Sequence, residues 1–114
     1  MRENVALNKS INFSVGIRNF CNVLYNKSET AIANQLLRFG MAIGANISEA
    51  QQAESRSDFI HKMKISAKEA SEASYWLSIC EKSNIAGFQQ ELRKELNELI
   101  AIISKIIITA KKNS

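Results

Sequence analysis

Proline is absent from this chain of 114 residues, and glycine occurs only four times. Loop-rich β architectures need turn residues at short, regular intervals, so this scarcity argues against most all-β folds. Cysteine occurs twice, as Cys21 and Cys80, inside helix-like segments and at no spacing typical of a metal site. We therefore expect a reduced, buried pair of thiols.

Long apolar runs are lacking as well. No run reaches the roughly 18 residues that a membrane-spanning helix requires, so no membrane partner is expected. The first residues, Met1 to Asn4, lead into a mixed polar stretch instead of the apolar segment of a secretory signal. The sequence therefore predicts a cytoplasmic protein.

The remaining composition is that of one ordinary globular domain over residues 1–114. Hydrophobic residues make up 46% and charged residues 23%, values that exclude a disordered chain. A chain of this size buries roughly two-thirds of its unfolded surface, enough for a core without disulfides or metals. The net charge of +4 is compatible with nucleic acid, with an acidic partner or with no specific partner.

Apolar residues recur at spacings of three and four along nearly the whole chain, the period of an amphipathic helix. Polar breaks fall at 26–28, 55–58 and 82–87, and Ser28 and either Ser55 or Ser57 are suited to cap the helices that follow. Four long helices with short turns predict an all-α, antiparallel up-down-up-down bundle. The expected core positions are Phe13, Ile17, Phe20, Leu24, Ile32, Leu36, Phe39, Ile43, Ile47, Ala50, Phe59, Met63, Ala67, Ala70, Leu77, Cys80, Phe88, Leu92, Leu96, Leu99, Ile103, Ile106 and Ala110.

Two glycines, Gly40 and Gly44, lie four residues apart in the second helical segment. Each costs about 1 kcal/mol of helix propensity, which suggests that close packing compensates. The third segment is rich in alanine and serine, so we expect the second and third helices to approach closely there. A ligand groove lined by these small residues is the alternative.

The fourth segment has more isoleucines than one buried face requires. A surface helix buries one stripe, and four isoleucines lie beside or opposite it. Such a surplus predicts a second buried surface, most simply an interface between subunits of a homo-oligomer. The candidate interface residues are Ile100, Ile102, Ile107 and Ile108.

Candidates for metal or acid–base chemistry are few. His61 is the only histidine and follows Asp58 by three residues, but a di-iron bundle needs a second such motif, and Asp58 suits a helix start. Glu49, Glu69 and Glu72 could serve as paired carboxylates, yet no nucleophile, oxyanion donor or phosphate loop accompanies them. We expect a polar lattice of these acids with Asn46, within or between subunits, and predict no enzyme, no metal and no cofactor. An enzyme acting through the three acids is a remote alternative.

Basic residues give the clearest indication of a partner. On a helical wheel several fall opposite the Leu92–Leu96–Ile103 stripe, and two arginines lie in apolar helix with no acid nearby. A one-sided basic face can neutralise phosphates, although a solvated lysine face has the same pattern. No aromatic residue interleaves these positions, so base stacking is not indicated. The candidate residues for nucleic-acid binding are Arg18, Arg38, Arg93, Lys94, Lys105, Lys111 and Lys112.

The middle of the chain carries a recognisable order of motifs. They read GANISEA at 44–50, SDFIHKM at 57–63, AKEA at 67–70 and YWL at 75–77, followed by IITAKKN at 107–113. Over almost its whole length the chain resembles the "four helix bundle protein" family, first noticed as products of intervening sequences in bacterial large-subunit ribosomal RNA genes. Where the family often reads Asn-Ile-x-Glu-Gly, this chain has Ala50 after Glu49.

The resemblance implies a bacterial cytosolic protein that assembles into a ring-shaped homo-oligomer, commonly a pentamer. A related branch, the accessory variability determinant of diversity-generating retroelements, is a basic pentameric barrel that binds nucleic acid and a reverse transcriptase. We therefore expect an oligomeric scaffold or accessory interaction protein with weak, sequence-independent affinity for the RNA or DNA backbone. The alternative is a purely structural or protein-binding module without affinity for nucleic acid.

Overall fold

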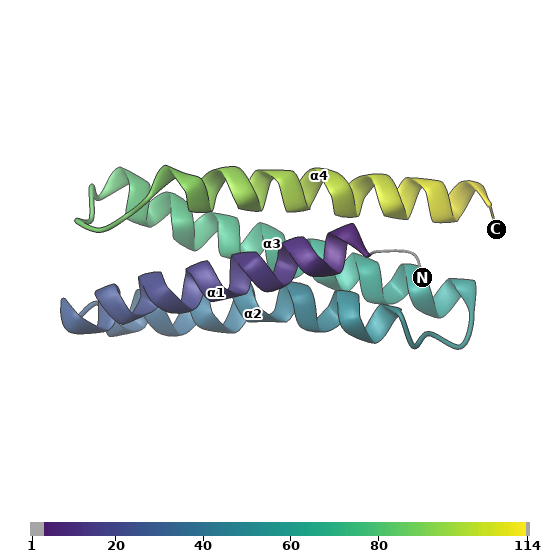
Figure 1. Ribbon diagram of the computed structural model, residues 1–114, viewed down its shortest axis with the longest axis horizontal. Coiled ribbons are helices and arrows are strands. Elements are labelled where there is room, and N and C mark those ends of the chain that lie inside the picture. Colours follow the sequence, from purple (N-terminus) through teal and green to yellow (C-terminus); the bar gives the residue numbers. More distant parts are fainter. Residues whose placement is uncertain (1–3, 114) are drawn as a thin grey trace.

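The computed structural model describes residues 4–113, which form a bundle of four helices measuring 47 × 24 × 21 Å (Figure 1). The helices are α1 (Val5–Asn26), α2 (Thr30–Ala50), α3 (Arg56–Lys82) and α4 (Gln90–Lys112). Each helix packs on the next in the chain, and α4 returns to α1. The predicted all-α, up-down-up-down architecture is confirmed. Among residues 4–113, no helix combines the length and apolarity needed to cross a bilayer.

Local polar groups fix the helix ends. The Asn4 side chain accepts a hydrogen bond from the Leu7 amide at 2.9 Å, and the Ser55 hydroxyl accepts one from the Asp58 amide at 3.0 Å. These bonds satisfy amides that the first helical turn leaves without partners. Ser28, expected as a cap, instead adopts a left-handed conformation with φ of 62° inside the α1–α2 turn. Its expected role as a cap is therefore wrong.

Apolar side chains fill the interior. Burying each large one contributes about 1.5–3 kcal/mol. Two polar residues, Ser10 and Ser66, are also buried, and their hydroxyls donate to the carbonyls of Leu7 and Ile43 at 2.7 and 2.8 Å. Within the described residues no buried side-chain polar atom lacks a partner. The largest fully buried side chains are Phe13, Ile17, Leu24, Leu36, Ile43, Ile47, Met63, Leu77, Leu96, Leu99, Ile103 and Cys21.

Both cysteines belong to this core as free thiols. Burial raises the pKa of Cys21 and of Cys80 from 9.0 to about 11. At neutral pH both thiols are therefore protonated, and they pack as small apolar groups. The expectation of a buried, reduced pair is confirmed.

The glycines of α2 bring that helix close to α1. A Cβ at Gly44 would lie 2.7 Å from the Ser10 hydroxyl oxygen, and one at Gly40 would lie 3.1 Å from a methyl carbon of Ile17. The close packing of the two glycines is confirmed, but they face α1 and not α3. The expected close approach of α2 and α3 is also present, because these two helices make the most extensive contact in the bundle and the Ser66 hydroxyl lies 2.8 Å from the Ile43 carbonyl. Ser10 and Ile17 occupy the space that the alternative, a ligand groove, would need.

The two outer helices of the chain, α1 and α4, contact each other less than any other neighbouring pair does. Lys9 of α1 pairs with Glu98 of α4 at 2.9 Å, and this pair sets how the antiparallel helices align. Val5, four residues before Lys9, therefore lies level with Ile102, four residues after Glu98. From there α4 continues for about 15 Å at 1.5 Å per residue. In Figure 1 the yellow end of α4 extends past the purple start of α1.

We expect Gly44→Leu to lower the free energy of unfolding by about 1–3 kcal/mol or more, because the added side chain meets Ser10 in a filled interior. Urea denaturation monitored by circular dichroism measures this change. Ala31→Leu, at an exposed position of the same helix, is the matched control and should leave stability nearly unchanged. An equal midpoint for Gly44→Leu and the control would refute close packing at Gly44.

Candidate nucleic-acid interface

Charge is distributed unevenly over the bundle. Between Asn4 and Ser48, a span that includes α1 and most of α2, the only acidic residue is Glu29, in the turn between these helices. Most of the charged residues lie on α3 and α4. The α1–α2 side therefore has few charges, most of them basic, and the α3–α4 side has many charges of both signs.

Lysines line the α3–α4 side. On α3, Lys64, Lys68 and Lys82 are exposed and share one stripe with Ser78, because these positions recur at helical spacings. Ser78 contacts Arg93 of α4, so this stripe borders α4. On α4, three further exposed lysines follow at spacings of eleven and seven residues and face outward. We call these six residues the basic face: Lys64, Lys68, Lys82, Lys94, Lys105 and Lys112.

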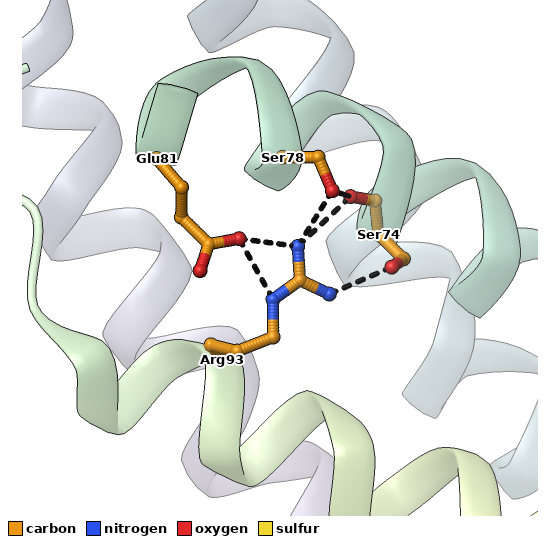
Figure 2. Close-up of polar contacts among 4 residues, drawn as sticks. All are labelled: Ser74, Ser78, Glu81 and Arg93. Atoms are coloured by element: carbon orange, nitrogen blue, oxygen red, sulfur yellow. Dashed lines mark hydrogen bonds and ion pairs between the residues drawn. The ribbon is translucent and has the colours of Figure 1, made fainter. Parts of the chain in front are cut away.

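Arg93 holds α3 and α4 together (Figure 2). Its Nη2 and Nε donate to one carboxylate oxygen of Glu81 at 2.7 and 2.9 Å, and its Nη1 donates to the Ser74 hydroxyl at 2.7 Å. Its Nη2 also donates to the Ser74 carbonyl and the Ser78 hydroxyl at 3.1 and 3.0 Å. The Arg93 side chain is only 17% exposed. The expectation that it points away from the core stripe is wrong: it follows Leu92 by about 100° of helix rotation and lies on the flank that faces α3.

The remaining candidate cations are divided between two sides of the bundle. Arg18 and Arg38 are exposed on α1 and α2, away from the basic face, and the Arg38 guanidinium lies 5.3 Å from the centre of the Phe39 ring. Lys111 is exposed on the same flank of α4 as Arg93. Of the seven candidates, the structure brings together Lys94, Lys105 and Lys112 on one outward stripe.

An exposed aromatic ring lies within the basic face. Tyr75 is 62% exposed, and its position seven residues after Lys68 and seven before Lys82 places it on their stripe. Its ring meets that of Trp76 edge to face at 5.2 Å. Such a ring can stack on a nucleic-acid base. Sequence reasoning missed it because only the basic positions on other helices were compared with the aromatic residues. The repeat Lys68, Tyr75, Lys82 was the available signal.

The expected polar lattice does not form within one chain. Glu49 pairs with Lys62 at 3.3 Å, linking α2 to α3, and the Asn46 amide donates to a carbonyl of its own helix at 2.9 Å. Glu69 and Glu72 are half-buried on α3, and among the described residues no hydrogen bond or ion pair joins either of them to Glu49. A lattice between subunits stays a prediction.

Acidic side chains lie along the groove between α1 and α4. Burial, with Glu91 and Glu98 nearby, raises the pKa of Glu95, while a hydrogen bond from Lys9 lowers the pKa of Glu98. This groove would repel phosphates. His61 is exposed on α3, and within residues 4–113 no three potential metal ligands of the His, Cys, Asp and Glu types gather.

Most of the isoleucines expected at a subunit interface on α4 are partly buried within the monomer. Ile100, Ile102 and Ile107 are half-buried and pack against the core of the same chain, whereas Ile108 is 55% exposed. Much of the surplus therefore completes the monomer. The larger exposed apolar groups lie instead on α1, where Val5, Ile11 and Val15 are each 53% exposed.

Neighbouring residues of α2 extend this apolar surface. Leu37 and Met41 are half-buried and share a stripe with Gly44, which faces α1. We call Ile11, Val15, Leu37 and Met41 the uncharged face. It is an exposed apolar surface that another protein surface could cover, although Arg18, three residues after Val15 and seven after Ile11, lies on the same stripe of α1.

We expect Arg93→Lys to lower the free energy of unfolding by about 1–3 kcal/mol, because a lysine keeps the charge but cannot donate to Glu81, Ser74 and Ser78 together. Chemical denaturation measures the change. Lys94→Ala, at the adjacent exposed position, is the control and should shift stability by only a few tenths of a kcal/mol. Equal stability of Arg93→Lys and the native chain would show that the hydrogen bonds of Arg93 contribute nothing net.

Comparison with known proteins identifies the fold and the family. The crystal structure of a protein with unknown function from the S23 ribosomal protein family of Bacteroides thetaiotaomicron matches with a TM-score of 0.83 and 37% sequence identity. The match covers 90% of this chain and 98% of that one. No curated protein matches this chain.

The family match is consistent with the order of motifs in the sequence. The family described as 23S rRNA-intervening sequence protein matches residues 2–108, almost the whole chain. The helices, the turns between them and the relative from Bacteroides all agree with this assignment. The chain belongs to the 23S rRNA-intervening sequence protein family.

Proposed function

We propose that this protein is a self-associating accessory protein that binds the backbone of RNA or DNA through its basic face. The observation that carries the proposal is the gathering of six exposed lysines on one side of the bundle. Glu81, which borders them, is already paired with Arg93. Lys94 interacts with Glu98, so the positive charge available to an anionic partner is carried mainly by the other five lysines.

The geometry of the basic face suits a backbone more than a base sequence. The three lysines of α4 are spaced about 16 and 10 Å apart along the helix, at 1.5 Å per residue. Lysine is a flexible point charge without the planar fork that reads base edges. Contacts of this kind position a nucleic acid without selecting its sequence. Tyr75 adds one exposed ring and favours a single strand, whose bases are free to stack.

The relative of known structure favours RNA as the partner, because it carries the S23 ribosomal protein name. The family description names an intervening sequence of 23S rRNA, which says where such proteins are encoded and leaves the partner open. We assign the protein to the bacterial cytoplasm on the same basis. A purely structural module with a solvating lysine face remains the rival function, and the two differ in their affinity for nucleic acid.

Self-association is the second part of the proposal. The uncharged face offers apolar side chains, and the asparagines of the outward surface of α1, Asn8, Asn12, Asn19 and Asn22, both donate and accept hydrogen bonds. Pairing of this surface with its own copy would have to leave Arg18, on the same stripe of α1, at the edge of the contact, where its charge stays in water. A stable interface buries about 800 Å² per partner, more than one helix presents, so α1 and α2 would both contribute. We propose a closed ring, with five subunits as the resemblance implies.

We expect retardation of single-stranded RNA and DNA in an electrophoretic shift assay, independent of base sequence. Binding should weaken steeply between about 50 and 200 mM salt, because neutralised phosphates release counterions. The double variant Lys94→Glu with Lys112→Glu should lose most of the affinity. The rival function predicts no shift at the lowest salt.

Lys27→Glu is the matched control for nucleic-acid binding, since it changes the charge equally but lies in the α1–α2 turn. It should retain most of the affinity. Tyr75→Ala should weaken binding of single strands more than of duplex. A clean negative with folded, assembled protein, or equal losses in the control and the double variant, would refute the basic face as the binding surface.

We expect light scattering at micromolar concentration to give a mass that is a multiple of the 12.8 kDa monomer. Ile11→Glu with Val15→Glu should reduce the mass to that of the monomer, because it places charges in the proposed interface. Ile108→Glu, an exposed isoleucine of α4, is the comparison. If Ile108→Glu alone reduces the mass to that of the monomer, the interface lies on α4 and not on the uncharged face. A native protein with the mass of the monomer would refute self-association.

A further inference from the structure

Among residues 4–113, the bundle has three helices instead of four at one end. Because α1 begins level with Ile102, the last ten residues of α4 face no residue of α1. The first turns of α3 and the end of α2 complete this end of the molecule (Figure 1). A helix-sized position between α4 and α2 is therefore open within the part of the chain that the structure describes.

A groove occupies this position. It has a volume of about 390 Å³, within the range of ligand sites. Its walls are Phe59 of α3 and Ile102, Ile106 and Ala110 of α4, and a smaller apolar hollow beside Ala50 and Ala53 adjoins it. Phe59, Ile102 and Ile106 are half-buried, so each still exposes apolar surface that an occupant could cover. We call this the open-end groove.

The rim of the open-end groove is cationic. Arg56 and Lys105 line it, and no acidic residue is among the described residues that line it. Arg56 donates to the Ala110 carbonyl at 3.4 Å, a long bond that leaves most of its donors free for another acceptor. An occupant therefore needs apolar groups for the walls and a negative charge for the rim.

We propose that the open-end groove docks an acidic amphipathic helix of a partner protein. The open position is about 15 Å long, which corresponds to about ten residues of helix. A helix laid there would place apolar residues at i, i+3 or i+4, and i+7 on the walls and acidic residues beside Arg56 and Lys105. It would complete the fourth position of the bundle at this end.

Other occupants fit the groove less well. Its apolar walls offer nothing to a phosphate backbone. A second copy of this chain would bring its own cationic α4 end, with Lys105 and Lys112, against Arg56. The inference goes beyond binding of nucleic acid and does not depend on it, because Ile106 and Phe59 are not part of the basic face.

A displayed library of random peptides of about 16 residues, long enough for a marginal helix, is the probe. Selection uses the native protein, with subtraction against Ile106→Glu. The enriched peptides should be net acidic with helical spacing of apolar residues. The strongest one, made synthetically and labelled, is then titrated by fluorescence anisotropy.

We expect the affinity of this peptide to fall by about tenfold or more in Ile106→Glu, as for loss of a central apolar contact. Ile108→Glu, the same change on an exposed part of the same helix, should bind normally. Lys105→Glu should weaken the acidic peptide and strengthen a copy whose acids are replaced by lysine. This exchange of preference does not depend on how far a groove variant is destabilised.

Each contrary result overturns the proposal. It is wrong if no peptide is enriched over Ile106→Glu, or if the enriched peptides are neutral or basic. Binding of anionic phospholipid vesicles that Ile106→Glu abolishes, without peptide enrichment, would make the groove a lipid site. If Ile106→Glu reduces the mass of the protein to that of the monomer, the open-end groove is a contact between copies of this chain. Lys94→Glu with Lys112→Glu should bind the peptide normally, so failure of this proposal and failure of nucleic-acid binding are distinguishable.

Discussion

The close approach of α1 to α2 is the constraint on which the rest of the bundle depends. Gly40 and Gly44 remove the side chains that would hold the helices apart, and Ile17 and Ser10 fill the space. With α1 seated against α2, its contact with α4 is the smallest in the bundle. The position of α4 is then set mainly by α3, and the five hydrogen bonds of Arg93 supply polar contacts between these two helices. The most extensive contact is that between α2 and α3, which joins the α1–α2 pair of helices to the α3–α4 pair.

The division into pairs coincides with the division of charge. The α1–α2 pair carries few charges, among them the exposed Arg18 and Arg38, and the α3–α4 pair presents the lysines of the basic face. An apolar protein contact and a phosphate-binding surface would interfere if they shared one side of the bundle, and here they lie on different sides. An apolar contact tolerates few desolvated charges, whereas a phosphate-binding surface needs many exposed ones. A ring built through the α1–α2 pair would leave the lysines of every subunit accessible, and a polyanion touching several subunits would bind through their combined contacts.

The sequence predicted the helices and the core well, because a period of 3.6 residues fixes which face of each helix is buried. It could not identify the neighbour that each flank meets. The glycines of α2 were placed against α3 although they face α1, since a wheel gives an angle to the core and no handedness of the bundle. Arg93 was placed outside because its length and its partners Ser74, Ser78 and Glu81, twelve to nineteen residues away, are invisible to a pattern within one helix. Tyr75 was missed because the aromatic residues were compared only with the basic positions of other helices.

The isoleucines of α4 show how one sequence signal can have two physical causes. A surplus of apolar residues beside a core stripe predicts a second buried surface, and the pattern alone does not say what covers it. Here Ile100 and Ile107 are covered by the core of the same chain, because α4 is packed on both of its flanks over most of its length. Ile102 and Ile106 lie where α1 has not yet begun, so their half-burial has a different origin. Covering them fully would remove apolar surface from water at about 25 cal/mol per Å². Any helix that fills the open-end groove would gain this free energy. Because the rim carries Arg56 and Lys105, that helix must be acidic.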